Sequence, residues 1–391
     1  MKIVLFLALV YTVRAAPTEE DAVQEFTDGN HRFSANLYKE LTKVKSGNMV
    51  MSPFSAQTVL ALTHEGARGE SAEEMVSGLS LPSTNEKIQQ AFKSFLPKLA
   101  SAHKDLKLST ANKVYVGQGV KLEDEFKQVA ENIFESGAET VNFASNVEAA
   151  AKINSWVEDR TERRIKNLID PVSIGGDTKM VLVNTLYLKG RWQSPFYRYR
   201  TAKRTFHVSK DETVEVDMMG QTEYLKYYEN SALKAKFLEM SYSGGNVSMV
   251  FILPNDIDGL PALEQNMDAL LAPQPFELRR VDVKIPKFKI ETEIEMIPIL
   301  EKLGIKKIFD GEKADLSGLS STNKHLVISK VIQKVYIDVN EDGTEAAAST
   351  AVVAVLTSMP LPPSGHFIAD HPFAFYIKCN GVILFVGRFS K

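Results

Sequence analysis

Cysteine is almost absent from this chain of 391 residues, which contains only Cys379. A single cysteine cannot form an internal disulfide, so packing and hydrogen bonding must stabilise the folded chain. Cys379 lies in a strand-like pattern near the C-terminus, and we interpret it as a small buried side chain in preference to a reactive thiol.

An excess of charge of one sign and long hydrophobic runs are also lacking. The formal net charge is −3, which gives no sign of nucleic-acid or membrane binding. The apolar stretch at residues 3–10 is shorter than the roughly 18 residues that a membrane helix requires. It is followed by Val13-Arg14-Ala15, a pattern suited to cleavage after Ala15. Residues 1–15 are therefore predicted to be a signal peptide, and the protein to be secreted and extracellular.

Familiar catalytic and metal-binding motifs are missing as well. There is no G-x-S-x-G elbow for a nucleophilic serine. His64-Glu65 lacks the second histidine of a zinc-protease helix, and Gly117-Gln118-Gly119 lacks the third glycine of a dinucleotide loop. Residues 338–343 match the start of a calcium-binding EF-hand loop, but Ser349 stands where a bidentate glutamate is needed. We therefore predict no enzyme activity, no metal site and no cofactor.

Hydrophobic periodicity predicts helices in the first part of the chain and mostly strands after it. No linker rich in Pro, Gly or Ser divides the sequence, so we predict one α+β domain over residues 16–391. The predicted helices are 19–44, 55–67, 71–79, 86–100, 122–134, 147–161 and 294–303. The predicted strands are 111–116, 181–188, 213–219, 237–240, 249–253, 281–289, 326–340, 373–378 and 382–389.

Two runs of basic residues allow two interpretations. The usual explanation of such runs is a solvated surface, and the alternative is a site for a polyanion such as a sulfated polysaccharide. The first run is Arg160, Arg163, Arg164 and Lys166, and the second is Arg198, Arg200, Lys203 and Arg204.

The segment from Glu341 to Ser358 has an unusual composition. Gly343 allows a bend, small side chains fill most of 344–351, and Val352-Val353-Ala354-Val355 favours a strand. Such a segment can be an exposed loop at one time and an inserted strand at another. A short alanine-rich helix is the alternative, although the β-branched run and the prolines at 360, 362 and 363 oppose it.

At this point the sequence resembles the serpin family over essentially its whole predicted mature length. Asn48-Met49-Val50-Met51-Ser52-Pro53-Phe54-Ser55 is similar to the family's N-x-x-x-S-P-x-S element, and Asp370-His371-Pro372-Phe373 is similar to its C-terminal signature. Further elements occur in family order at 66–71, 111–112, 153–157, 183–184, 189–192, 253–254, 285–288 and 303–305. The resemblance is closest to secreted inhibitory invertebrate serpins. It implies about nine helices, three β-sheets and an exposed reactive loop at about 343–361.

The resemblance also implies a mechanism, that of a monomeric suicide inhibitor of serine proteases. The protease attacks the loop and is trapped as an acyl-enzyme when the freed segment inserts into the main sheet. The family's usual spacing implies a reactive bond at Thr357-Ser358, with Leu356-Thr357 as the second choice. Because Thr357 carries no charge, an elastase-like or chymotrypsin-like protease is favoured, and a trypsin-like one is not excluded. Innate immune defence or developmental proteolysis in a body fluid is the setting that similarity to invertebrate members implies.

Two sets of site residues follow from the same resemblance. The hinge of the loop is implied at Glu341, Gly343, Thr344, Ala346, Ala347 and Ala348. The region where the sheet opens is implied at Ser52, Ser55, Asn184, Trp192 and Gln333, and Gln333 replaces a histidine that is common in the family. The alternative function is a serpin-fold binding or carrier protein that does not inhibit. The small hinge residues argue against it, since non-inhibitory members tend to carry bulky or charged ones.

Overall fold

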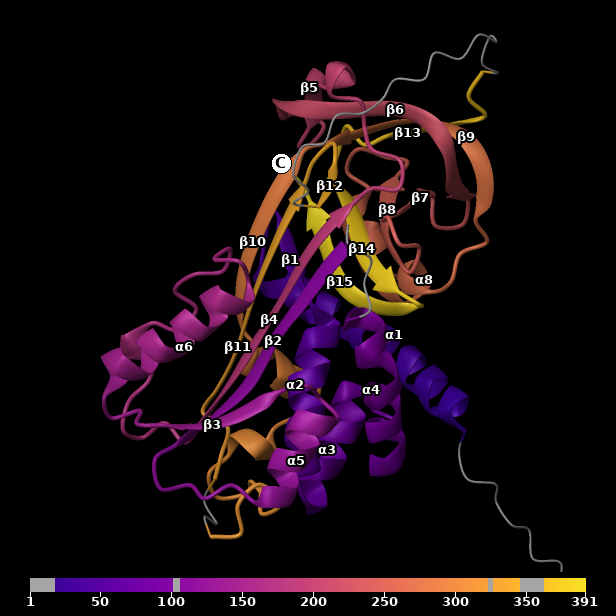
Figure 1. The fold of residues 1–391 in the computed structure, drawn as a ribbon. Helices are drawn as coiled ribbons and strands as arrows, with labels where there is room; N and C mark the ends of the chain where they lie inside the picture. Colours follow the sequence, from indigo (N-terminus) through magenta and orange to yellow (C-terminus); the bar gives the residue numbers. More distant parts are fainter. Residues whose placement is uncertain (1–17, 101–105, 323–325, 345–361) are drawn as a thin grey trace, which may run out of the picture.

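The computed structural model describes residues 18–100, 106–322, 326–344 and 362–391 (Figure 1). Hydrogen bonds join the described strands into two sheets, and helices pack against both faces of the smaller one (Figure 1). The α-helices of these ranges are α1 (Glu19–Val44), α2 (Pro53–Glu65), α3 (Gly69–Leu79), α4 (Asn85–Ala100), α5 (Asp124–Asn132), α6 (Asn146–Arg160), α7 (Leu260–Glu264), α8 (Met267–Leu271) and α9 (Ile297–Lys302).

Capping residues fix where the first two helices begin. The Thr18 hydroxyl accepts a hydrogen bond from the Asp21 amide, and the Asp21 carboxylate accepts one from the Thr18 amide, which closes a capping box. Helix α2 begins with Pro53 after Ser52, whose hydroxyl accepts from the Ser55 amide. This cap places Ser52 and Ser55 under the smaller sheet.

The smaller sheet has six strands in the order β10-β11-β12-β4-β2-β3. Their bounds are β10 (Phe288–Glu295), β11 (Lys330–Val339), β12 (Gly343–Thr344), β4 (Met180–Arg191), β2 (Leu106–Gly117) and β3 (Gly137–Val141). Strands β11 and β4 pair directly and in parallel, from Lys330 opposite Val181 to Tyr336 opposite Tyr187. We call this parallel pairing the seam. The two residues of β12 lie between the same two strands at one end of the seam.

The larger sheet follows the order β1-β15-β14-β8-β7-β6-β9-β13, and β5 pairs with β6 at one edge. Its strands are β1 (Met49–Met51), β5 (Ala202–His207), β6 (Thr213–Asn230), β7 (Ala235–Ser241), β8 (Val247–Pro254), β9 (Glu277–Pro286), β13 (Gly365–Ile368), β14 (Phe373–Cys379) and β15 (Val382–Phe389).

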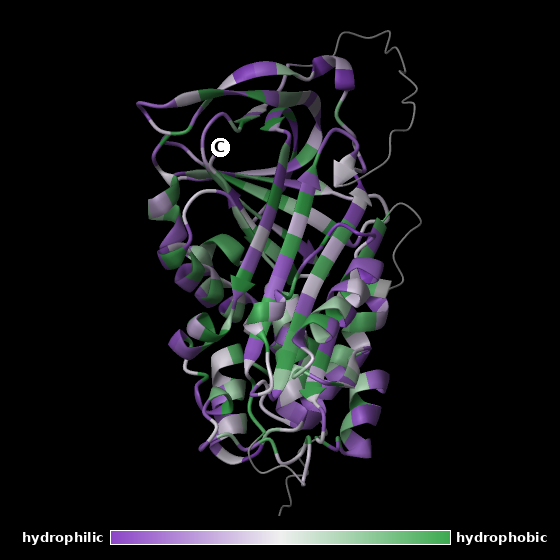
Figure 2. Cartoon of the chain, turned by 90° about the vertical axis from the view of Figure 1, so that its left-hand side faces the viewer, coloured by the Kyte–Doolittle hydropathy of each residue, from purple (hydrophilic) through white to green (hydrophobic). Residues whose placement is uncertain are grey.

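Two hydrophobic cores lie on opposite faces of the six-stranded sheet. Neighbouring residues of a strand point to opposite sides of the sheet. Hydrophobic and hydrophilic residues alternate along several of the strands (Figure 2), whereas β4 is buried on both faces. Leu182 and Leu186 of β4 belong to the main core, whereas Val181 and Val183 belong to a smaller core with Ile153 of helix α6. Any strand that entered the seam would therefore have to match a different environment on each side.

The sequence-based expectations are mostly confirmed, with three corrections. The strand predicted at 281–289 is two strands, because the chain turns at Lys287 between β9 and β10. The helix predicted at 294–303 is shorter, because β10 continues to Glu295. The implied third sheet is not found as a separate unit among the described residues, because the long strand β6 pairs with β5, β7 and β9 and joins them into one sheet.

Candidate functional site: the hinge and the seam

The hinge residue Thr344 is already part of the six-stranded sheet. It pairs antiparallel with Val339 of β11 on one side and with Gly190 of β4 on the other. Its side chain is fully buried, and its hydroxyl lies 2.6 Å from the hydroxyl of Tyr242. The Tyr242 ring stacks on Trp192 with a centroid distance of 4.4 Å. These contacts give the chain a defined entry point at the end of the seam.

A glycine is required at position 343 because the backbone there passes very close to β4. A Cβ atom at this position would lie 1.9 Å from the carbonyl oxygen of Gly190. This oxygen belongs to the backbone of β4, which cannot shift as a flexible side chain could. Its φ of +152° is also rarely adopted by residues with side chains. Any substitution of Gly343 would therefore force the hinge out of the sheet.

Two carboxylates anchor the turn before the hinge. Glu341 accepts a hydrogen bond from the Thr201 hydroxyl at 2.8 Å and forms an ion pair with Lys287 at 3.0 Å. Burial raises the pKa of Glu341, but the hydrogen bonds from Lys287 and Thr201 outweigh burial and hold the pKa below its ordinary value. Asp342 forms an ion pair with Arg198. The turn is thus tied to the segment that follows β4 and, through Lys287, to the junction of β9 and β10.

A buried polar network crosses the seam further along. Gln333 of β11 lies opposite Asn184 of β4, and its side-chain nitrogen donates to the Asn184 side-chain oxygen. Gln333 also accepts from the Ser52 amide at 2.9 Å and donates to the Ser52 carbonyl at 2.8 Å. Asn184 donates to Ser55 Oγ at 2.6 Å and to Asn112 Oδ1 at 2.7 Å. The network holds β4 and β11 together and ties both to the start of α2.

The implied sheet-opening residues therefore divide into two groups. Ser52, Ser55, Asn184 and Gln333 form one network, whereas Trp192 lies at the hinge, where its indole nitrogen donates to the Asn340 carbonyl at 3.0 Å. Asn112 and Tyr242 were missed as site residues because only tertiary contacts reveal them. Asp342 lies within the segment that the sequence singled out, but its ion pair with Arg198 was not predicted. The predicted hinge residues Ala346, Ala347 and Ala348 and the predicted reactive bonds at 356–358 lie outside the described residues.

The second basic run lies beside the hinge. Arg198 contacts Asp342, Lys203 forms an ion pair with Asp217 at 3.2 Å, and the Arg200 guanidinium lies 5.5 Å from the Tyr197 ring centroid. Arg204 is exposed on β5.

The first basic run lies at the end of α6. Arg160 packs over the Trp156 ring at 5.9 Å, Arg163 and Arg164 are exposed, and the carbonyl of Lys166 accepts from Lys334 Nζ of β11 at 3.0 Å. Both runs are surface features, and only the second touches the hinge.

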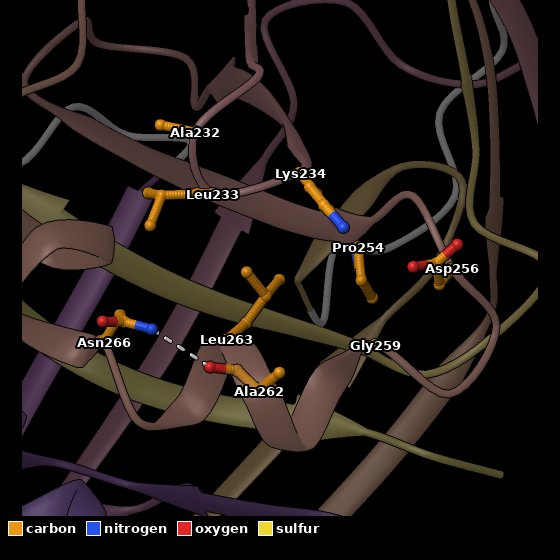
Figure 3. Close-up of a pocket in the computed structure, with 9 residues that line it drawn as sticks. All are labelled: Ala232, Leu233, Lys234, Pro254, Asp256, Gly259, Ala262, Leu263 and Asn266. Atoms are coloured by element: carbon orange, nitrogen blue, oxygen red, sulfur yellow. Dashed lines mark hydrogen bonds between the residues drawn. The ribbon is translucent and has the colours of Figure 1, made fainter.

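Hollows of different sizes lie at the surface of the described residues. One of about 270 Å³ lies between the β6–β7 turn, the end of β8 and α7 (Figure 3). Leu233, Pro254 and Leu263 give it apolar walls, and Lys234 and Asp256 bring charged groups to it. A second hollow of about 700 Å³ lies beside α6 and includes Glu158, Asp170 and Glu293.

Within the described ranges, no group of three or more His, Cys, Asp or Glu side chains is arranged to hold a metal ion. None of the helices described is long and apolar enough to cross a membrane.

Comparison with known proteins gives the family. The sequence profile of the serpin (serine protease inhibitor) family matches residues 28–391. The chain is 39% identical to Alaserpin of Manduca sexta, covering 95% of each protein, and 38% identical to Antichymotrypsin-2 of Bombyx mori, covering 93% of this chain and 97% of the relative. The chain belongs to the serpin family, which confirms the resemblance noted in its sequence.

Solved structures agree on the fold. The structure of Serpin48 of the insect Tenebrio molitor is 41% identical and has a TM-score of 0.88, covering 94% of this chain and 98% of that one. The complex of thyroxine-binding globulin with thyroxine also matches, with 27% identity and a TM-score of 0.84 over 93% of this chain and 98% of that one. The serpin fold is therefore confirmed.

Proposed function

We propose that this protein is a secreted suicide inhibitor of serine proteases that works by insertion of its cleaved loop into the seam. The observation that carries the proposal is the position of β12, whose two residues are antiparallel to both β4 and β11 although those strands are parallel to each other. Insertion would exchange one parallel ladder for two antiparallel ones. A dozen newly paired residues, at roughly 0.5–1.5 kcal/mol per hydrogen bond, would contribute on the order of 10 kcal/mol.

The loop sequence matches the seam when the register of β12 is continued. Thr344 opposite Gly190 and Val339 places Ala346 and Ala348 opposite the apolar residues of the main core in β4 and β11. The same register places Thr350 between Asn184 and Gln333, the one polar pair of the seam on that face. In this register the small apolar side chains of the loop would face the apolar core, and the hydroxyl of Thr350 would face the polar pair.

The proposed reactive bond is Thr357-Ser358, with Leu356-Thr357 as the second choice. Neither residue before these bonds carries a charge, which favours a protease with a small or apolar pocket, elastase-like or chymotrypsin-like, without excluding a trypsin-like one. The name of Antichymotrypsin-2 agrees with a chymotrypsin-like target. We place this activity in extracellular fluid, in defence proteolysis.

Incubation with elastase, chymotrypsin and trypsin tests the proposal. We expect an SDS-stable adduct with at least one enzyme, and mass spectrometry of the released C-terminal peptide should show a new terminus at Ser358 or Thr357. Loop cleavage should also raise the thermal stability of the protein. A simple nick without an adduct and without a gain in stability would overturn the proposal.

The alternative is a carrier of a small molecule, and the similarity to thyroxine-binding globulin is the observation in its favour. The hollow in Figure 3 is slightly below the roughly 300–1,000 Å³ typical of ligand sites. The hollow beside α6 is large enough but is lined partly by carboxylates. The hinge already seated in the seam favours inhibition over this alternative.

We also propose a sulfated polysaccharide as a partner, bound at the second basic run. The first run offers similar charge, but Arg198 connects the second run directly to Asp342 of the hinge turn. An Arg200→Ala/Arg204→Ala variant should elute earlier from immobilised heparin than Arg163→Ala/Arg164→Ala. Binding that persists unchanged in 1 M salt, or an equal effect of both variants, would overturn this assignment.

A further inference from the structure

Two large hydrophobic side chains are exposed side by side on the larger sheet. Tyr224 of β6 is 58% exposed and Leu278 of β9 is 70% exposed. Lys226 lies directly opposite Leu278, and Tyr224 is two residues before Lys226, so Tyr224 and Leu278 share one face as diagonal neighbours. Exposed apolar residues are ordinary when scattered, but an adjacent pair is a feature to be explained.

The pair borders a hollow of about 210 Å³ whose charges are already neutralised. Glu239 lies in its lining, nearly buried, and pairs with Lys226 at 3.1 Å and Lys378 at 3.0 Å. Burial raises the pKa of Glu239, but the two lysines outweigh burial and hold the pKa below its ordinary value. Because the carboxylate is satisfied, the hollow does not call for a cation. Gln193, Ser194 and Ser241 also line it, so the exposed apolar surface at this place is supplied by Tyr224 and Leu278.

The chain segment that follows the proposed reactive loop reaches the larger sheet close to this pair. The Ser364 amide donates to the Arg280 carbonyl at 2.8 Å, and Arg280 lies directly opposite Tyr224. Two strand spacings, about 10 Å, therefore separate Ser364 from Tyr224. Leu278 lies on the intervening strand, β9, two residues before Arg280.

Chain length limits how far a bound protease can lie from the pair. Ser358 precedes Ser364 by six residues, which span at most roughly 20 Å. A protease domain of about 220 residues has a radius of gyration of about 17 Å. A protease that holds the proposed reactive bond is therefore within contact range of Tyr224 and Leu278.

We propose that Tyr224 and Leu278, with the hollow between β6 and β7, form a second docking surface for the target protease, outside its catalytic cleft. The inference rests on the proposed inhibitory function and names a further part of the same interface. The surface contributes to the rate at which the protease is captured and not to the insertion that follows. An exposed apolar side chain on the protease, beside its substrate cleft, is the group that packs on Tyr224 and Leu278.

The test compares full-length variants with the fastest-reacting of chymotrypsin, elastase and trypsin. We expect Tyr224→Ala and Leu278→Ala each to lower the second-order rate of adduct formation about three- to tenfold, and the double variant more than tenfold. The stoichiometry of inhibition and the gain in thermal stability after loop cleavage should not change. Val44→Ala, which truncates an even more exposed apolar side chain on α1, should leave the rate unchanged.

Each other outcome has a defined meaning. Failure of the unaltered protein to form any adduct would reject the proposed function. Normal adduct formation with a double variant that reacts within twofold of the unaltered rate would reject only the docking surface. A dimer of the unaltered protein that the double variant converts to a monomer would assign the surface to a second copy of the chain, and would also overturn the inference.

Discussion

Replacing Thr350 by valine is expected to destabilise the loop-inserted form and to leave the uncleaved form unchanged. In the proposed register Thr350 enters between Asn184 and Gln333, whose mutual hydrogen bond must break when β4 and β11 separate. The threonine hydroxyl can accept from the Gln333 amide and donate to the Asn184 oxygen. Valine has a similar shape but can do neither.

The magnitude follows from the bonds that remain. Gln333 keeps both of its hydrogen bonds to Ser52, and Asn184 keeps those to Ser55 and Asn112. One N–H group and one carbonyl oxygen therefore lose their partners, at the low end of the roughly 1–3 kcal/mol that each buried unsatisfied group costs. We expect a loss of about 2 kcal/mol in the free energy of unfolding of the cleaved protein.

Guanidinium unfolding of the cleaved and uncleaved proteins measures this loss. With an m-value of about 5 kcal/mol/M, the midpoint of the cleaved form should fall by roughly 0.4 M. Thr350→Ser should behave like the unaltered protein, and Ser349→Val should cost less because residue 349 faces the other side. An unchanged midpoint for Thr350→Val would refute the register, and a loss confined to Ser349→Val would indicate a slip of one residue.

Three further predictions concern other parts of the molecule. Thr344→Arg would bury an unpaired charge at a fully buried site, which costs several kcal/mol, and should slow insertion at least a hundredfold. The variant should then behave as a substrate of the protease, which is measured by the moles of inhibitor consumed per mole of protease. Thr205→Arg, on an exposed strand position, should have no such effect. Burial, with a smaller effect of Arg68, lowers the pKa of His64 to about 4, so protonation of His64 favours the unfolded chain. About 3 kcal/mol of the free energy of unfolding should therefore be lost as pH falls from about 6.5 to 4. The His64→Gln variant should not show this loss in urea unfolding. Asn246 is exposed after two glycines and is followed by Val247-Ser248, so it should carry an N-linked glycan when the protein passes through a secretory pathway. The Asn246→Gln variant should then show no change in gel mobility after treatment with a deglycosylating enzyme.

Local patterns predicted most of the fold. Helix α1 was predicted with the bounds that its capping box sets, and the apolar run at 181–188 lies inside β4 as expected for a strand covered on both faces. The short helices α7 and α8, with five residues each, escaped prediction because one turn carries too little periodicity.

Contacts between distant segments could not be predicted from such patterns. Nothing in the sequence near Tyr242 shows that it meets Thr344, which lies 102 residues further on. The ion pair of Arg198 with Asp342 joins segments 144 residues apart, so the sequence identified the basic run without its connection to the hinge. Four of the five residues of the seam network, Ser52, Ser55, Asn184 and Gln333, were found only through resemblance to a family. Nothing local in the sequence explains why polar side chains are buried in β4, in β11 and at the start of α2.

The parallel seam has a consequence for the kinetic stability of the uncleaved protein. If an antiparallel strand in the seam is the more stable arrangement, the uncleaved chain persists because its loop is tethered at both ends and the rearrangement is slow. Its resistance to heat is then set by an activation barrier, and an apparent melting temperature should rise with the heating rate. Variants of the uncleaved form should therefore be compared by their half-life at a fixed temperature as well as by denaturant unfolding.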